Sequence, residues 1–180
     1  SCIREDLDKS AARRLAVINP LKITITNYPE DKIESLKAVH HPKDESFGER
    51  ELKLTREVYI DKADFTEEAN RKYKRLVTGG EVRLRNAYVI RADEVIKDDA
   101  GEIIELKCTY DPETLGVNPE GRKVRGVIHW VSASEGVPAE IRLYDRLFSH
   151  PTPESDKSVD DWKDHLNPES LTCVTNCMVE

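Results

Sequence analysis

The sequence has no long apolar run. No window approaches the about 18 uninterrupted apolar residues of a membrane-spanning helix, and the opening stretch SCIREDLDKSAARR lacks the apolar core of a secretion signal. Charged residues make up 35% of the 180-residue chain, and the mean hydropathy is −0.62. We therefore expect a cytoplasmic protein without a membrane partner, built as one generous domain or two small ones.

Cysteine is also scarce, which argues against a disulfide framework. The four cysteines, at positions 2, 108, 173 and 177, are irregularly spaced, and a chain of this length can bury a core without disulfides. Reduced thiols are therefore expected. Cys173 and Cys177 have no second pair of ligands nearby, and His40 and His41 have no third ligand, so we predict no metal site.

Signatures of catalysis are absent as well. The sequence shows no phosphate-binding loop, no nucleophile motif and no pair of acids placed for acid–base chemistry. The residues themselves thus indicate a binding module with no catalytic residue and no cofactor of its own.

The chain lacks the basic excess of a general nucleic-acid binder. Its net charge is −7 and its pI is about 5.4, so no DNA partner is expected. One segment departs from this balance: between Arg71 and Arg91, Glu81 is the only acid among the basic residues Arg71, Lys72, Lys74, Arg75, Arg83, Arg85 and Arg91. A concentrated basic surface on an acidic body suits one selected polyanion.

Alternation within this segment predicts how its arginines are displayed. On a strand, Val82 and Leu84 would point inward while Arg83 and Arg85 stand side by side on the outer face. The planar guanidinium fork can pair with a phosphate or with the edge of guanine. From the residues alone two interpretations stay open: a nucleic-acid contact surface, or a solvated face with surface ion pairs worth about 0–1 kcal/mol each.

Short alternating segments predict a mainly β fold. We expect strands within residues 16–27, 34–42, 52–60, 81–111, 124–132, 137–148 and 167–180. One short helix is predicted over 61–76, where acids precede Lys and Arg as the helix dipole favours. Trp130 lies in an apolar strand and is expected in the core. Regular short strands with turn signals favour a barrel or a sandwich.

Several longer motifs resemble a known family. The stretches INPLKITITNYPED, GGEVRLRNAYVIRADEVIKD, GRKVRGVIHWVSA and AEIRLYDRLFSHPTPES resemble the C-terminal anticodon-binding domain of bacterial glutaminyl-tRNA synthetases. The resemblance implies two ribosomal-protein-like β-barrels with exchanged N-terminal strands. Residues 1–150 would form the first barrel together with the N-terminal strand. Residues 151–180 would begin a second barrel that is incomplete here, because the family continues beyond Glu180.

The same resemblance implies a function. The domain would splay the anticodon bases of tRNA(Gln) into separate pockets, in keeping with the rule that RNA sequence is read on unstacked single strands. It would act as a monomer within glutamine–tRNA ligase. The catalytic domain that binds ATP with Mg²⁺ is not part of this chain, because no His-x-Gly-His or Met-Ser-Lys element occurs.

The resemblance also implies individual contacts. Arg13 would help to read the middle base, Lys74 and Arg75 would serve the third base, and Arg83 and Arg85 would hold the first base and its phosphate. Lys72 stands where many relatives carry Gln, and a Gln-x-Glu-Arg segment that completes the middle pocket would follow Glu180, so the middle-base site is expected to be incomplete. Alternatives are the same domain of a glutamyl-tRNA synthetase, a stand-alone ribosomal-RNA-binding barrel, and a protein-interaction barrel.

Overall fold

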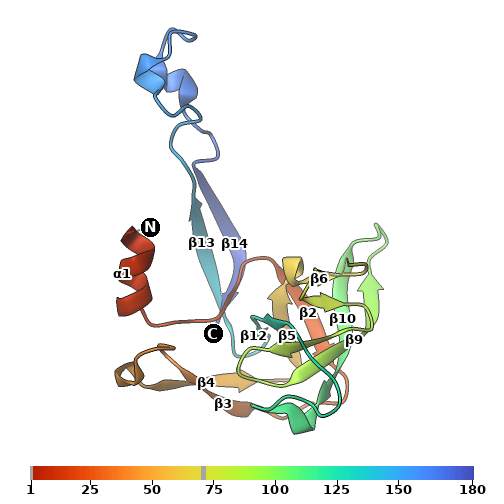
Figure 1. Ribbon diagram of the computed structural model, residues 1–180. Coiled ribbons are helices and arrows are strands. Elements are labelled where there is room, and N and C mark those ends of the chain that lie inside the picture. The colour runs from red at the N-terminus through yellow and green to blue at the C-terminus, as the bar shows by residue number, and fades with distance from the viewer. Residues whose placement is uncertain (1, 70–71) are drawn as a thin grey trace.

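The computed structural model describes residues 2–69 and 72–180. Its main feature is a seven-stranded sheet that curls into a half-barrel (Figure 1). In spatial order its strands are β11 (Val127–Ile128), β8 (Glu81–Leu84), β9 (Val89–Lys97), β10 (Ile103–Asp111), β2 (Pro20–Ile25), β5 (Glu57–Asp61) and β12 (Val131–Ser132). The pairs β10–β2 and β11–β8 are parallel, and the others are antiparallel. The prediction of a mainly β, barrel-like fold is confirmed.

The two edges of this sheet meet at one short segment. Strands β11 and β12 lie at opposite edges, yet only His129 and Trp130 separate them in the chain. The predicted single strand 124–132 is therefore two short strands, one paired with β8 and the other with β5. This segment ties β8, which carries Arg83, to the far edge of the sheet.

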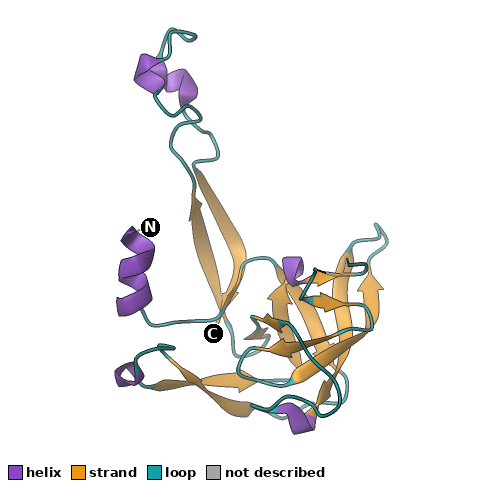
Figure 2. Cartoon of the chain, in the orientation of Figure 1, coloured by secondary structure: helices purple, strands orange, loops and turns teal. Residues whose placement is uncertain are grey.

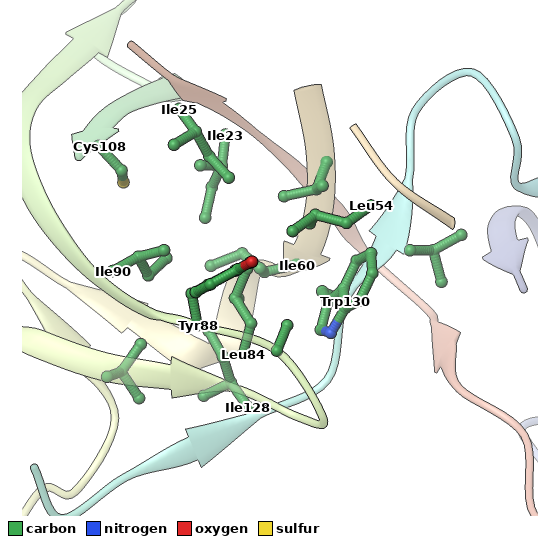
Figure 3. Packing of buried hydrophobic residues seen from close by; sticks show 14 of the residues in the cluster. Ile23, Ile25, Leu54, Ile60, Leu84, Tyr88, Ile90, Cys108, Ile128 and Trp130 are labelled. Atoms are coloured by element: carbon green, nitrogen blue, oxygen red, sulfur yellow. The ribbon is translucent and has the colours of Figure 1, made fainter. Parts of the chain in front are cut away.

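Trp130 and the alternating apolar residues of the strands fill the core (Figure 3). Ile23 and Ile60 are fully buried, as their alternation predicts, and Trp130 is only 2% exposed. The indole Nε1–H of Trp130 donates to the carbonyl of Arg85 at 2.8 Å. Burying such a side chain contributes on the order of 2 kcal/mol or more, so Trp130 is a core residue, as predicted, and it also fixes the backbone of Arg85.

A β-hairpin covers one end of the half-barrel. It consists of β3 (Glu34–Val39) and β4 (Glu49–Leu54), joined through the 3-10 turn η1 (Glu45–Phe47). The predicted strand 52–60 is divided here: β4 ends at Leu54 and β5 begins at Glu57. The Thr55 hydroxyl contacts the carbonyl of Glu57 at 2.7 Å and the hydroxyl of Ser132 at 2.6 Å, and these bonds hold the bend between the strands.

The predicted helix over 61–76 is wrong for the described residues of that range; residues 70 and 71 lie outside the described part. The chain forms a 3-10 turn, η2 (Lys62–Asp64), followed by β6 (Phe65–Thr66) and later by β7 (Leu76–Val77). Strands β6 and β7 pair in parallel, Phe65 opposite Leu76, and both side chains are buried. Core packing of these two residues outweighs a helix propensity that would be marginal over such a length.

A helix occurs instead at the N-terminus, where none was predicted. Helix α1 (Cys2–Ser10) has no buried residue. It contacts the hairpin through Asp8: Lys43 Nζ lies 2.8 Å from its carboxylate, and His41 Nε2 lies 2.8 Å from its carbonyl oxygen. An apolar stripe, the usual signal of a packed helix, does not mark this segment.

A second sheet extends away from the half-barrel as a long ribbon (Figures 1 and 2). Its order is β1 (Ala16–Val17), β14 (Leu171–Val179) and β13 (Val137–Tyr144). The N-terminal segment therefore supplies β1 to the ribbon sheet and β2 to the half-barrel. The remaining 3-10 turns are η3 (Pro112–Thr114), η4 (Pro153–Ser155) and η5 (Trp162–His165). A domain division near residue 150 stays a prediction. None of the described helices has the length and apolar content needed to span a bilayer.

Candidate nucleic-acid interface

Basic residues from two distant parts of the sequence line one hollow of about 600 Å³, which we call the basic hollow. Its lining residues are Lys72, Tyr73, Lys74, Arg75, Arg125, Gly126 and Val127. Within the described part of the chain, none of the lining residues is acidic. A concave surface with an aromatic ring and several cations suits a nucleotide, since the ring can stack on a base and the cations can pair with phosphates.

Gly126 brings the two segments of the basic hollow together. A Cβ atom at this position would lie 2.0 Å from the carbonyl oxygen of Lys74 and 2.8 Å from Cγ2 of Val82. Only glycine therefore allows the backbone of Lys74 to pass so close to β11. The Gly126 carbonyl also accepts the N–H of Arg83 at 3.0 Å, which fixes the segment against β8.

Turn η2 anchors one side of the basic hollow. Arg75 Nη1 lies 3.0 Å from Asp64 Oδ1 and donates to the carbonyl of Ala63 at 3.2 Å. The hydroxyl of Tyr73 donates to the same carbonyl at 3.3 Å. Burial raises the pKa of the Asp64 carboxyl more than the nearby Arg75 guanidinium lowers it. Arg75 is half exposed, so one side of its fork is oriented by the protein and the other faces the hollow.

Lys74 and Arg125 contribute two further positive charges to the basic hollow. Both are exposed, and neither side chain has a hydrogen bond or ion pair with another residue of the described chain. A cation that the fold does not neutralise remains available for a ligand. Arg125 was not among the predicted contacts. It reaches the hollow because β11 pairs in parallel with β8, and local charge counting cannot show such a contact.

Arg83 is held by the backbone of a neighbouring loop. It projects from the outer face of β8 as predicted, with Val82 and Leu84 buried. Its Nη1 donates to the carbonyls of Ala87 at 2.9 Å and Thr114 at 2.6 Å, and its Nη2 donates to the carbonyl of Val117. Much of its hydrogen-bonding capacity is therefore used to shape the loop after η3.

Arg83 also lines a second hollow of about 630 Å³. The lining of this hollow comprises Ser35, Leu36, Lys37, Arg83, Asn86, Ala87, Leu115, Gly116 and Asn118. The charge of Arg83 is not paired with a carboxylate within the described chain, so it keeps a positive potential at this surface.

Arg85 is the freer of the two arginines. It is exposed, and its side chain makes no hydrogen bond or ion pair within residues 2–69 and 72–180. Desolvation and then the Arg85 charge lower the pKa of His129, while Asp64, the partner of Arg75, acts on His129 in the opposite sense. The charges of Arg85 and of Asp64 therefore act on the same histidine in opposite senses.

Residues 11–111 match the family model described as "tRNA synthetases class I (E and Q), anti-codon binding domain". Residues 127–180 match a second model of the same description. The chain belongs to this family. Glutamine–tRNA ligase of Stutzerimonas stutzeri is 57% identical over 178 residues, which is 99% of this chain. That of Vibrio vulnificus is 59% identical over 181 residues, covering the whole chain. This chain spans 32% of the length of each of these relatives.

Within this anticodon-binding domain, Lys74 and Arg75 line the basic hollow and Arg83 lines the second hollow. Arg85 and Arg13 are not among the lining residues of either hollow. Nη1 of Arg13 donates to the carbonyl of Ala11 at 2.8 Å, and Nη2 lies 2.7 Å from Asp8 Oδ1. These bonds hold it at the end of α1, a helix that lies on the opposite side of the view from β6 (Figure 1). A contact between Arg13 and a base stays a prediction.

Proposed function

We propose that this domain holds the anticodon loop of tRNA(Gln) in its basic hollow, as part of a glutamine–tRNA ligase. The observation that supports this most directly is the lining itself, in which Tyr73 and four basic residues meet on a protein of net charge −7, with no acidic residue among the lining residues that the structure describes. Identity of 57% and 59% with glutamine–tRNA ligases favours tRNA(Gln) over the tRNA(Glu) that the family description also allows.

The lining suggests how one nucleotide would be held. Tyr73 offers a ring for stacking, which is worth about 1–3 kcal/mol per base. Arg75 and Arg125 offer guanidinium forks to a phosphate or a base edge. Lys74 adds a mobile ammonium group. Arg83, at the second hollow, and Arg85, just past the end of β8, would hold a neighbouring nucleotide.

We propose that the aminoacylation reaction takes place in another part of the parent enzyme. We infer that ATP with Mg²⁺ and glutamine bind in the remaining two thirds of the relatives' length, and that this domain contributes recognition alone. We further expect the domain to be monomeric and cytoplasmic. Membership in the synthetase family argues against two other interpretations of the sequence, a stand-alone ribosomal-RNA-binding barrel and a protein-interaction barrel.

Two substitutions test the proposal. A labelled anticodon stem-loop of tRNA(Gln) is titrated with the protein, and its dissociation constant is measured by fluorescence anisotropy. We expect Lys74→Ala and Arg125→Ala each to weaken binding about 5- to 150-fold, which corresponds to about 1–3 kcal/mol for a good contact.

The matched controls are Lys157→Ala and Arg146→Ala, which remove the same charges from exposed positions outside the basic hollow. Affinity equal to that of these controls would exclude the basic hollow as the contact surface. A tRNA(Glu) stem-loop that binds as tightly as the tRNA(Gln) stem-loop would instead contradict the choice of tRNA.

A further inference from the structure

The tip of the β13–β14 ribbon forms a small lobe, residues 145–170, that lacks a core. No residue of this lobe is buried, and Phe148 meets Trp162 edge to face at 5.7 Å while Trp162 stays 44% exposed. The two arms are joined by backbone bonds such as Ser149 N–H to the His165 carbonyl at 2.8 Å. The lobe also contains no cysteine. Units this small usually need a disulfide or a metal to hold one structure.

Three side chains with metal-binding atoms converge inside this lobe. The rings of His150 and His165 stack with centroids 5.0 Å apart. Oδ2 of Asp156 lies 3.1 Å from Nε2 of His165 and 3.8 Å from Nε2 of His150. One ligand atom from each residue lies within 4.8 Å of the other two. The three atoms are close enough together for a single ion to contact all of them. The two histidines lie on the two arms of the lobe, and Asp156 lies on the loop between them.

His165 adds a second observation that points to a ligand. Its Nε2 atom is buried and has no hydrogen-bond partner in the described chain, because the nearby Asp156 oxygen is not in hydrogen-bonding geometry. The side chain as a whole is only 13% exposed. A buried polar nitrogen without a hydrogen bond is unfavourable, and a metal bond to Nε2 would satisfy it.

We propose that His150, Asp156 and His165 bind a divalent first-row transition metal ion of the Zn²⁺ type. Zinc bonds of 2.0–2.2 Å in a tetrahedron imply ligand–ligand separations of about 3.3 Å, and the two nitrogen–oxygen distances here bracket that value. Imidazole and carboxylate ligands suit such ions. Three protein ligands leave a fourth position for water, and the ion would fix the two arms of the lobe.

Two hydrogen bonds next to the proposed site show which contacts stay and which must change when the metal ion binds. Asp156 Oδ1 accepts the N–H of Ser158 at 2.9 Å, which orients the carboxylate. Nδ1 of His150 lies 3.2 Å from the N–H of Thr152. Coordination through Nε2 leaves the His150 proton on Nδ1, so this contact must open. The proposal departs from the sequence-based expectation of no metal site, which considered His40, His41 and the Cys173–Cys177 pair.

Calorimetric titration of the whole chain with Zn²⁺ tests the proposal. We expect one equivalent to bind, and Asp156→Asn or His165→Gln to weaken binding more than about tenfold, since even loss of an outer partner weakens metal sites about 10- to 100-fold. Asp164→Asn, the same change at an exposed position of the lobe, is the matched control. Cys173→Ser shows whether a thiol is responsible.

Hydrogen exchange supplies a readout that does not depend on the variants. Zn²⁺ should slow exchange at the amides of Ser149 and Asn167, which join the two arms, and leave the half-barrel unchanged. The proposal is overturned if the chain binds no Zn²⁺ saturably, if Asp156→Asn binds it as Asp164→Asn does, or if Cys173→Ser removes the binding.

Discussion

Glu34 accepts hydrogen bonds from two tyrosines at the end of the half-barrel. Tyr28 donates to Oε2 at 2.9 Å and Tyr88 donates to Oε1 at 3.0 Å, while Lys32 lies 3.1 Å from Oε2. Burial opposes ionisation of Glu34, but the three donors outweigh it and lower its pKa. Burial and the bond to Glu34 raise the pKa of Tyr88 to about 12. The cluster joins the hairpin to Tyr88, the residue that directly precedes β9.

This cluster predicts a loss of stability at high pH. Because the pKa of Tyr88 is higher in the folded chain than its ordinary value of 10.0, its contribution is complete below pH 10 and is lost as pH rises toward 12. The loss should amount to about 2–3 kcal/mol. Urea unfolding of the wild type and of Tyr88→Phe should show a gap in unfolding free energy at pH 9 that closes by about pH 12.

The exposed Tyr144 supplies the control for this measurement. Tyr144→Phe should follow the wild type over the whole pH range, because its hydroxyl is not part of the cluster. A gap between wild type and Tyr88→Phe that stays constant up to pH 12 would disagree with a raised pKa at Tyr88.

Single-residue alternation is the part of the structure that the sequence predicts best. Val82 and Leu84 point inward and Arg83 points outward, as the period of two requires. The bonds from Arg83 to the carbonyls of Thr114 and Val117 could not be predicted, since they depend on where a distant loop lies. The sequence thus gives the direction of Arg83 but not the atoms it contacts.

At the level of elements, Gly126 controls how β11 meets the segment that carries Lys74. We predict that Gly126→Ala separates them, because the added methyl group cannot fit against the Lys74 carbonyl. Such overpacking costs about 1–3 kcal/mol. Affinity for the anticodon stem-loop should fall together with the free energy of unfolding, measured by anisotropy and by urea titration.

Gly121→Ala is the comparison for this substitution. Gly121 has positive φ (71°), and nothing lies within 4 Å of an added Cβ, so alanine there is strained but does not displace Lys74. It should lower stability while leaving RNA affinity near that of the wild type. Equal affinity of the Gly126→Ala and Gly121→Ala proteins would show that the contact at Gly126 does not shape the interface.

Two elements show where prediction from sequence fails. Residues 61–76 have the charges of a helix, but Phe65 and Leu76 gain more by pairing in the core as β6 and β7. Helix α1 forms without burying a residue, so no apolar periodicity marks it. In the first case packing in the core overrides the local pattern, and in the second there is no apolar pattern that could mark the helix.

At the scale of the whole molecule, the basic hollow is a local excess of positive charge on an acidic protein. Charge counting marked Lys74 and Arg75, and Arg125 joins them in the basic hollow through the parallel pairing of β11 with β8. The basic hollow therefore follows from the topology of the half-barrel as much as from the local sequence. Such a surface should bind RNA with a strong dependence on salt despite the net charge of −7.

The most direct test of the basic hollow is the salt dependence of anticodon stem-loop binding. The doubly substituted protein Lys74→Ala/Arg125→Ala is compared with Lys157→Ala/Arg146→Ala, which has the same net charge. Loss of two phosphate contacts should make the slope of log K against log salt shallower by about 1.4, and the control pair should keep the wild-type slope. Identical slopes and affinities for the two doubly substituted proteins would contradict RNA binding in the basic hollow.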